Sequence, residues 1–564
     1  MKTNILKEFM PQFFISVKSY SKEKFASDLM AGLIVGIVAL PLAIAFGIAS
    51  GVTPEKGLFT AIIAGFIISF LGGNTVQIGG PTGAFIVIVY GIIQQYGIGG
   101  LAIATFLAGL MLVLMGVLKL GTVIKFIPYP IIVGFTSGIA VTIFSTQIKD
   151  LLGMDIDNIP SDFLAKWAVY FNHLNTIDWC TFAVGVVSIL IIVGSAKITK
   201  KIPGSLIAII VITIIAYILK SVFQIDGLET IGDRFTINAE LPEIESLPIT
   251  IESINLLFPS AFTIAILCAI ESLLSAKVAD GMTGARTNSN TELIAQGVAN
   301  LTVPFFGGIP ATGAIARTMT NINNGGRTPV AGMIHAVVLL LILLFLGDLT
   351  KHIPMACLAG VLVVVSYNMS EWRTFKDLLR GPKSDVAVLL TTFFLTVIFD
   401  LTIAIEIGLI LAIFLFLKRI MDTTQVSVMK DKLILSEEPD SEGNEDGLTL
   451  KKGIEVYEID GPFFFGIANK FDESMRIVGE KAKVRIIRMR KVPFMDSTGL
   501  HNLETLCIKS QKENIKVILS GVRPDVRMTL EKAGFYEIIG KDNICDNINI
   551  ALAKANSFLD ENNQ

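Results

Sequence analysis

Hydrophobic residues in this chain lie in long runs that are separated by short polar segments. Runs such as GLIVGIVALPLAIAFGIASG, VGVVSILIIVGSA, SLIAIIVITIIAYIL and AVVLLLILLFLG approach the length of about twenty residues at which a helix crosses a bilayer. The pattern predicts a polytopic α-helical membrane protein with about fourteen spans, which end near Phe416. The predicted spans lie near residues 28–50, 57–73, 82–96, 99–120, 126–146, 177–195, 204–222, 258–277, 291–306, 312–322, 329–347, 353–369, 384–400 and 402–417.

The composition agrees with a membrane protein. Of the 564 residues, 52% are hydrophobic and 17% are charged, whereas about a quarter of the residues in soluble domains are charged. The net charge of −3 gives no reason to expect a nucleic-acid partner. The five cysteines have neither metal-ligand nor redox spacing and are predicted to be unpaired thiols. Without a catalytic triad, metal cluster or Walker-type loop in the sequence, we expect no cofactor, no enzymatic activity and no ATP-driven transport.

Basic and acidic loops alternate between the predicted spans, and this alternation predicts the orientation. Lysines precede the first span and follow the sixth, a basic segment follows the twelfth, and the loops between them are acidic. Basic loops remain on the cytoplasmic side. We therefore expect an integral protein of the cytoplasmic (inner) membrane with both termini inside. The basic residues are Lys18, Lys22, Lys24, Lys197, Lys200, Lys201, Arg373, Lys376, Arg380 and Lys383.

A short motif occurs twice in the chain. GGPTGA begins at Gly79 and opens the third span, and GGIPATGA begins at Gly307 and opens the tenth. Both of these spans are too short to cross a hydrocarbon core of about 30 Å. An odd number of spans between the copies would invert the second copy, and interrupted segments at matching positions mark the midplane site of many transporters. The pattern predicts such a site here; the alternative is two ordinary loops that contain glycine.

The chemistry of these two segments suits an anion. Proline favours the first turn of a helix, threonine can cap it, and glycine lets backbone N–H groups approach a ligand closely. Two half-helices that begin near the midplane would direct two positive dipole ends at one point. Arg317 would add a cation there, unless it lies at the cytoplasmic end and extends to the interface.

Glu271 lies well inside the eighth span, in AFTIAILCAIESLLSAKVAD. An ionisable residue within the membrane is a functional candidate, and Ser275 shares its helix face. The alternative is a protonated carboxyl that forms a hydrogen bond with a neighbouring helix. Glu406 is expected at the membrane interface, and Ser289 with Glu292 has the spacing of a capping box for the ninth span.

Six segments together resemble the SulP family of anion transporters, over about residues 20–420: VALPLAIAFGIASG, GGPTGAF, ESLLSAKVAD, NSNTELIAQGVAN, GGIPATGAIART and NGGRTPVAG. The resemblance implies that residues 1–424 form a seven-plus-seven inverted repeat, in which a core domain (spans 1–4 and 8–11) moves against a gate domain (spans 5–7 and 12–14). It also implies a homodimer whose cytoplasmic domains contact each other. Carried over to this sequence, the anion site between the half-helices would include Thr82, Gly83, Glu271, Ser275, Gly313 and Ala314, with Pro41 and Ala43 of the first span. Arg317 completes the predicted set of substrate-binding residues, and Glu271 is the predicted coupling residue.

After an acidic linker, predicted for residues 425–450, the chain has the character of a small soluble α/β domain at residues 451–560. GIEVYEIDG, VRIIRM and IKVILSG have the pattern of strands, and GIANKFDESMRIVGEK has helical spacing. Asp496-Ser497-Thr498-Gly499 resembles the signature loop of STAS domains, in which the serine after the aspartate is phosphorylated in anti-sigma-factor antagonists. Ser497 is therefore a candidate regulatory site, although the same four residues also suit a helix cap, the interpretation we favour.

These observations predict a secondary active transporter of a small anion that works by alternating access. Members of the family carry sulfate, bicarbonate, chloride or C4-dicarboxylates, and the sequence does not choose among them. We expect Glu271 to couple transport to protons rather than sodium, because Ile315 lies where some sodium-coupled bicarbonate members have threonine. The alternatives are an anion exchanger or channel, a dicarboxylate transporter of the same fold, a sodium-coupled bicarbonate symporter, and a sensor that signals through its STAS domain.

Overall fold

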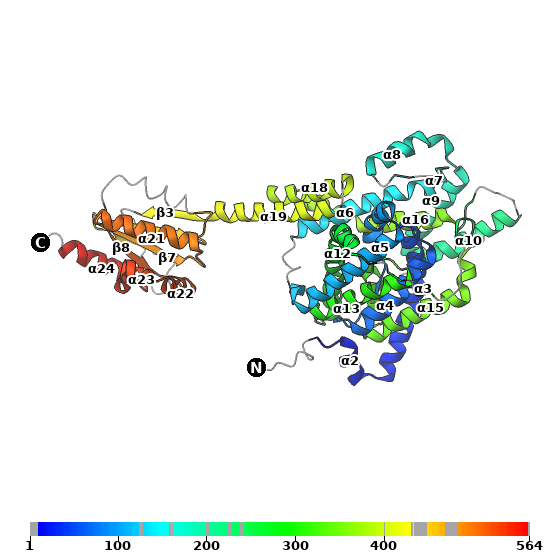
Figure 1. The fold of residues 1–564 in the computed structure, drawn as a ribbon, viewed down its shortest axis with the longest axis horizontal. Helices are drawn as coiled ribbons and strands as arrows, with labels where there is room; N and C mark the ends of the chain where they lie inside the picture. The colour runs from blue at the N-terminus through cyan, green and yellow to red at the C-terminus, as the bar shows by residue number, and fades with distance from the viewer. Residues whose placement is uncertain are drawn as a thin grey trace. The chain divides into compact units, whose positions relative to one another are not determined.

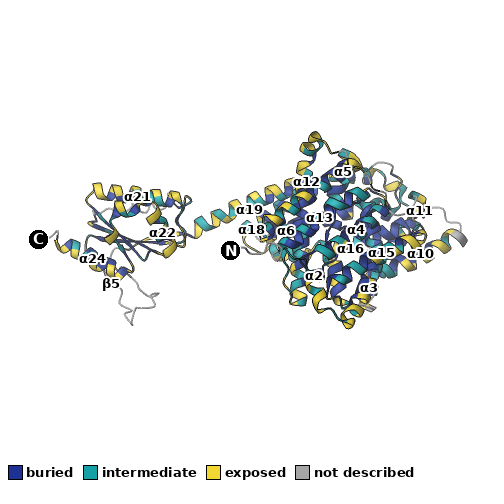
Figure 2. Ribbon diagram, turned by 60° about the horizontal axis from the view of Figure 1, so that its bottom comes forward, coloured by how far each residue is buried: buried dark blue, intermediate teal, exposed yellow. Residues whose placement is uncertain are grey.

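The computed structural model describes most of the chain as two units, each built around a buried core of its own (Figures 1 and 2). The first unit extends to Ala412 and the second begins at Ile413, inside helix α19 (Leu401–Thr423). The described residues are 9–122, 128–156, 159–160, 162–198, 203–222, 228–235, 242, 244, 246–247, 249–399, 401–429, 432–433, 448–467 and 482–561.

Each predicted span overlaps a helix. Proline occupies one of the first two positions of α4, α6 and α15, where its missing N–H costs nothing. The third and fourth spans form one element, α5, which is kinked at Gly97, where φ is 68°. The helices are α3 (Lys22–Ala49), α4 (Pro54–Leu71), α5 (Ile86–Val117), α6 (Tyr129–Thr146), α9 (Trp179–Ile198), α10 (Gly204–Val222), α12 (Ile251–Thr283), α13 (Ser289–Thr302), α14 (Ile315–Asn323), α15 (Pro329–Thr350), α16 (Met355–Met369), α18 (Lys383–Ile398) and α19.

Seven helical segments within the described residues are long and apolar enough to cross a membrane, judged by length and composition. They are Lys22–Ala49, Pro54–Leu71, Gly83–Val117, Tyr129–Leu152, Ile251–Thr283, Pro329–Thr350 and Met355–Leu378. The chain is therefore an integral membrane protein. The short segments that the sequence predicts are α14 and the part of α5 before Gly97.

The helix pairs that pack together in the structure occur in equivalent sets. If each helix is replaced by the helix at the same place in the other half of the chain, one packed pair becomes another. Helix α3 packs on α15, and α12, which holds the equivalent place in the second half, packs on α5. In the same way, α4 packs on α15 as α13 packs on α5, and α6 packs on α18 as α16 packs on α9. This correspondence is the arrangement expected of an inverted repeat.

Glycines bring α5 and α13 into close contact. A Cβ placed on Gly109 would lie 2.6 Å from the nitrogen of Leu301, and one placed on Gly297 would lie 2.6 Å from the nitrogen of Val113. Any larger residue would push the two backbones apart. Small residues serve this purpose at many helix interfaces in membranes.

The sequence-based prediction misses short helices of the first unit, among them α7 (Ile148–Leu152), α8 (Phe163–Asn172) and α17 (Trp372–Leu378). They connect longer helices and carry polar residues, so they produce no long apolar run. Helix α8 begins after Asp162, whose carboxylate accepts a hydrogen bond from the Ala165 N–H at 2.8 Å. This is an ordinary N-cap, and it fixes the start of the helix.

Asp28 fastens α3 to the turn that precedes α15. Its buried carboxylate accepts hydrogen bonds from the N–H groups of Arg327 (2.9 Å) and Thr328 (3.2 Å) and from the Tyr20 hydroxyl (3.0 Å). Removal of the carboxylate would leave these donors without their acceptor.

Asp28→Ala should therefore lower the free energy of unfolding by roughly 2–4 kcal/mol. The thermal unfolding midpoint of the detergent-solubilised protein measures the effect, and Asp377→Ala, at an exposed position of α17, is the control. Equal midpoints for the two variants would contradict an anchoring role.

The second unit contains a five-stranded sheet in the order β3–β6–β7–β8–β9. Strand β3 is antiparallel to β6, and the other neighbours are parallel. Alternate strand residues face two cores: Ile487 and Leu519 pack with α21 to α23, whereas Ile486 and Ile518 pack with α24. The elements are β3 (Gln425–Met429), β6 (Ile454–Asp460), β7 (Val484–Lys491), β8 (Lys516–Ser520), β9 (Ile544–Cys545), α21 (Ser497–Lys512), α22 (Pro524–Lys532), α23 (Phe535–Ile539) and α24 (Ile548–Glu561).

The three strands predicted for this unit are confirmed as β6, β7 and β8. Strand β3 lies within the segment predicted to be a linker, and it extends the sheet because its backbone pairs with β6 over five residue pairs from Gln425 to Met429. The helix predicted at 466–481 falls almost entirely outside the described residues.

Candidate functional site

The two copies of the repeated motif meet in space. Strand β1 (Gly79–Gly80) pairs antiparallel with β2 (Thr312–Gly313), so that Gly79 lies opposite Gly313. The Ala314 N–H also donates a hydrogen bond to the Ile78 carbonyl at 2.8 Å. A helical segment begins directly after each strand, and the first turns of such segments have N–H groups without a partner inside the helix. The predicted convergence of two helix starts is thus present.

Glycine is required where this pair of strands meets its neighbours. A Cβ on Gly313 would overlap the Nε2 of Gln77, and a Cβ on Gly80, whose φ is 151°, would overlap the Nη1 of Arg317. Gln77 itself donates a hydrogen bond to the Ser272 carbonyl of α12 at 3.0 Å. The strands are therefore enclosed by the side chains of Gln77 and of Arg317 on α14, and Gln77 is held in turn by the backbone of α12.

Glu271 faces the first half-helix. The Thr82 hydroxyl donates a hydrogen bond to the Glu271 Oε2 at 2.9 Å, which joins α12 to the residue that precedes the short 3₁₀ turn Gly83–Phe85. Glu271 keeps part of its surface accessible, whereas Thr82 and Gly83 are buried. The carboxylate therefore lies beside the N-terminus of the first half-helix, as the resemblance implies.

Arg317 is inside the protein and does not extend to an interface. Its side chain is 2% exposed, and its Nη2 donates a hydrogen bond to the Pro81 carbonyl at 2.7 Å. Among the described residues, none accepts a hydrogen bond from its Nη1. One guanidinium nitrogen is thus left for another group, beside the strand that leads to the first half-helix.

Ser275 is joined to the residue before β1, whereas Glu271 is bonded to Thr82, which follows β1. Its buried hydroxyl donates to the Thr318 Oγ1 at 3.4 Å, and that oxygen accepts a hydrogen bond from the Ile78 N–H at 3.0 Å. Pro41 and Ala43 are buried in α3, and the Ala43 carbonyl faces Gly57 of α4. The described contacts of Ala43 are therefore those of helix packing.

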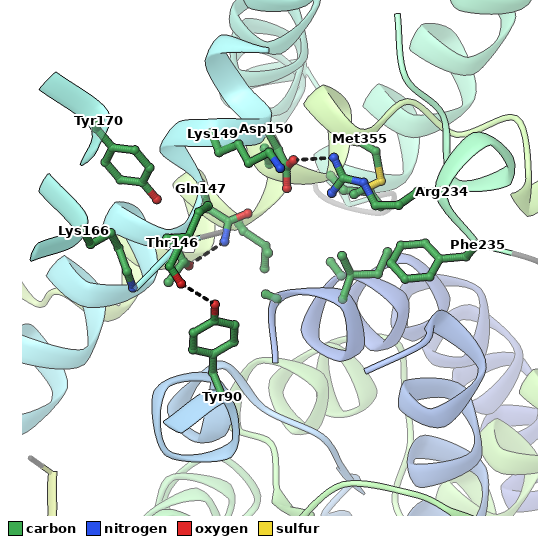
Figure 3. A pocket seen from close by; sticks show the side chains of 17 residues that line it. Tyr90, Thr146, Gln147, Lys149, Asp150, Lys166, Tyr170, Arg234, Phe235 and Met355 are labelled. Atoms are coloured by element: carbon green, nitrogen blue, oxygen red, sulfur yellow. Dashed lines mark hydrogen bonds and ion pairs between the residues drawn. The ribbon is translucent and has the colours of Figure 1, made fainter. Parts of the chain in front are cut away.

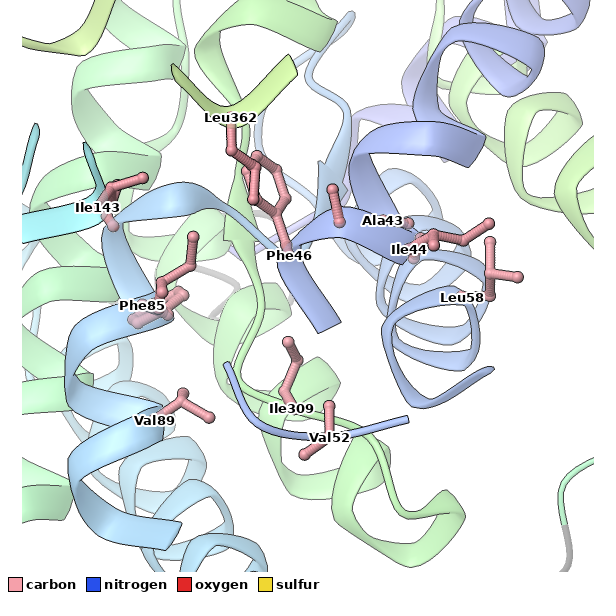
Figure 4. Close-up of a cluster of buried hydrophobic side chains, with 14 of the residues drawn as sticks. Ala43, Ile44, Phe46, Val52, Leu58, Phe85, Val89, Ile143, Ile309 and Leu362 are labelled. Atoms are coloured by element: carbon pink, nitrogen blue, oxygen red, sulfur yellow. The ribbon is translucent and has the colours of Figure 1, made fainter. Parts of the chain in front are cut away.

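Four apolar side chains that the sequence did not single out lie around the first half-helix. A Cβ on Gly83 would be 3.1 Å from the Met369 sulfur, 3.3 Å from the Ile143 Cδ1 and 3.5 Å from the Phe46 Cε1. Leu362 lies beside Phe46 in the same buried cluster (Figure 4). Each residue belongs to an apolar stretch of its helix, so no sequence signal distinguishes it from an ordinary core residue.

The predicted capping box of the ninth span is wrong. Asn288, not Ser289, caps α13, because its side chain accepts hydrogen bonds from the N–H groups of Asn290 and Thr291. The buried Glu292 carboxylate instead accepts from the Gly73 N–H at 2.9 Å, across the packed helices.

Glu406 is exposed on α19, as its predicted position at an interface requires. In the second unit, Asp496 caps α21, since its Oδ1 accepts a hydrogen bond from the Gly499 N–H at 2.7 Å. The cap interpretation of this loop is confirmed. Ser497 is exposed in the first turn of α21.

A helical membrane unit with two interrupted segments that meet at their N-termini is the architecture of an inverted-repeat transporter, and here an α/β unit follows it in the chain. The model of the sulfate permease family matches residues 25–392, and that of the STAS domain matches residues 448–551. The chain belongs to the sulfate permease family and is an anion transporter. Members of this family are transporters rather than enzymes.

Relatives of known name cover nearly the whole chain. The putative sulfate transporter YvdB of Bacillus subtilis is 42% identical over 94% of this chain and 97% of its own length. The bicarbonate transporter BicA of Picosynechococcus is 29% identical over 91% of this chain and 92% of its own length.

Solved structures share the fold. The transmembrane domain of a cyanobacterial BicA has a TM-score of 0.61 at 29% identity and covers 70% of this chain and 98% of that domain. The murine anion transporter Slc26a9 in its inward-facing state has a TM-score of 0.88 at 18% identity, over 99% of this chain and 95% of that one. These matches confirm the predicted fold class.

Proposed function

We propose that the protein is a secondary active transporter that moves a small inorganic anion such as sulfate or bicarbonate together with a proton, by alternating access. One contact carries the proposal: the hydrogen bond from the Thr82 hydroxyl to the Glu271 carboxylate at 2.9 Å. It places a titratable group beside the N-terminus of a half-helix that faces a second one, which is where an anion would be held.

The anion would be held by backbone N–H groups of the two first turns and by the free Nη1 of Arg317. A charged Glu271 would repel an anion at this point. Protonation of Glu271 would remove that repulsion, and so each anion would enter with a proton. Ile315 contributes no side-chain oxygen, whereas sodium requires several oxygen ligands close together.

Alternating access would come from two groups of helices. In this proposal α3, α4, α5, α12, α13, α14 and α15 form the core, α6, α9, α10, α16, α18 and α19 form the gate, and the membrane domain extends to residue 424. Ile143, Leu362 and Met369 of the gate, with Phe46 of the core, would form a barrier over Gly83 in one state. Both termini and the STAS domain would lie in the cytoplasm, and two copies would form a homodimer.

The names of the relatives support the choice of anion. YvdB is named a putative sulfate transporter and BicA a bicarbonate transporter. Sulfate is the first candidate because the relative named for it shares more of this sequence. The match to BicA favours bicarbonate as the second candidate.

Uptake into vesicles tests both the anion and the coupling ion. We expect labelled sulfate to accumulate when the outside is acidic, and to do so equally well when choline replaces sodium. Unlabelled bicarbonate and a C4-dicarboxylate serve as competitors. Accumulation that requires sodium and ignores a proton gradient would contradict proton coupling, and movement that never exceeds equilibrium would indicate a channel or exchanger.

A further inference from the structure

A polar cavity lies beside Tyr90 of the first half-helix, at the end of α3 that is opposite to Lys22. It has a volume of about 180 Å³, and its wall includes Ala45 and Ala49 of α3, Gln147, and residues of α7, α8 and α16 (Figure 3). A neighbouring cavity of about 290 Å³ shares Tyr90, Thr146 and Lys166 with it. Lys166 of α8 therefore lies between two spaces.

Lys166 is a buried cation that forms no ion pair with any residue that the structure describes, although the Asp162 carboxylate acts on it at longer range. The residue is 2% exposed, and its Nζ lies 5.7 Å from the centre of the Tyr90 ring, directed toward the cavity (Figure 3). No described residue forms an ion pair or a side-chain hydrogen bond with this Nζ within the part of the chain that the structure covers. A buried charge is costly unless it is paired, so a bound anion next to the Lys166 ammonium would stabilise it.

The helix that carries Lys166 is held firmly. The Tyr170 hydroxyl donates to the Ser145 carbonyl at 2.9 Å, and the Trp167 Nε1 donates to the Ser145 Oγ at 3.1 Å. Tyr170 is four residues from Lys166 and lies on the same buried face of α8. A lysine on the inner face of a short connecting helix interrupts its apolar pattern, which is typical of a functional position.

The surroundings of Lys166 favour an anion over a cation. The wall of the smaller cavity carries three cations, Lys149, Lys166 and Arg234, and one carboxylate, Asp150, which is already paired with Arg234 at 2.9 Å. Asp162 at the start of α8 lines the other cavity. Burial lowers the pKa of the Lys166 ammonium to about 8, while Asp162 acts in the opposite direction.

We propose that this cavity is a second anion site, in which the Lys166 ammonium captures a small inorganic oxyanion before it reaches the half-helices. The proposal rests on the proposed function, since it supplies the anion that the central site transports. Leu362 lines the cavity and also lies beside Phe46, so the apolar barrier over Gly83 separates the two sites.

Lys166→Met should raise the half-saturation concentration for sulfate uptake roughly tenfold when sulfate is added on the side of this cavity, because one charge-assisted contact is lost. The maximal rate and the half-saturation concentration from the opposite side should stay unchanged. Right-side-out and inside-out vesicles give the two measurements. Lys166→Arg should behave nearly as the wild type, and Lys351→Met, which removes a partly exposed cation at the end of α15, is the control.

A half-saturation concentration that is unchanged in Lys166→Met, or raised equally from both sides, would overturn the proposal. If this variant does not fold, chemical modification of the wild-type protein tests the proposal instead. Sulfate or bicarbonate should slow the reaction of Lys166 with an amine-modifying reagent, as measured by peptide mass spectrometry. Absence of protection by either anion overturns the second site. Absence of any transport by the wild type would instead overturn the proposed function, because protection at Lys166 does not require transport.

Discussion

Glu271→Gln should abolish accumulation of the anion against a gradient and leave its movement down a gradient in place. Glutamine keeps the shape of the side chain and can still accept the hydrogen bond from Thr82, but it cannot bind or release a proton. Because it is permanently neutral, it imitates the protonated state that admits the anion. The accumulation ratio should fall to about one, whatever proton gradient is imposed.

The measurement compares uptake driven by an acidic exterior with exchange of labelled for unlabelled anion in the same vesicles. Glu406→Gln is the matched control, since Glu406 is an exposed glutamate of the same membrane domain. Accumulation by Glu271→Gln that remains complete and dependent on pH would show that another group carries the proton.

Arg317→Gln should weaken anion binding at the central site by roughly 10- to 100-fold, the range expected when a charge-assisted hydrogen bond in a buried site is lost. Arg317 is buried and is joined through its Nη2 to the Pro81 carbonyl, while its Nη1 has no acceptor among the described residues. The substitution removes the buried cation that is bonded to Pro81, beside the N-terminus of the first half-helix. Arg317→Lys keeps the charge without the planar geometry, so its affinity for the anion should lie between that of the wild type and that of Arg317→Gln.

Stabilisation of the purified protein by increasing sulfate or bicarbonate reports this affinity without requiring transport, because a ligand that binds only the folded state raises the unfolding midpoint. Arg286→Gln, at an exposed position between α12 and α13, is the control. If Arg317→Gln and Arg286→Gln respond equally to the anion, Arg317 does not contribute to the site.

The longer membrane helices were predictable because each produces an apolar run of sufficient length, and the repeated motif directed attention to the residues that become β1 and β2. The sequence contains no information that sets Gly79 opposite Gly313, since that register depends on how α4, α12 and α14 pack. Lys166 was missed for a different reason. Helix α8 has only ten residues, and its buried face is defined by contacts with the end of α6, such as that between Trp167 and Ser145, which the local sequence pattern does not reveal.

In the α/β domain, too, the sequence predicted some elements and missed others. Strands β6, β7 and β8 have buried apolar residues and were predicted, whereas β3 lies in a segment of mixed polarity. What makes β3 a strand is the free edge of β6, which supplies its backbone partners. The barrier residues around Gly83 could not be selected either, because isoleucine, leucine, methionine and phenylalanine are common at every position of an apolar helix.

The pairing of β1 with β2 also bears on the order in which the protein can be made. Pro81 and Arg317, which are joined by a hydrogen bond, are 236 residues apart, so the first motif emerges from the ribosome long before its partner. Until the second motif arrives, the backbone groups of β1, which are buried in the folded protein, lack their partners, and unpaired buried groups are costly. The first repeat therefore cannot mature alone, and assembly of the membrane domain must wait for most of the chain to be synthesised.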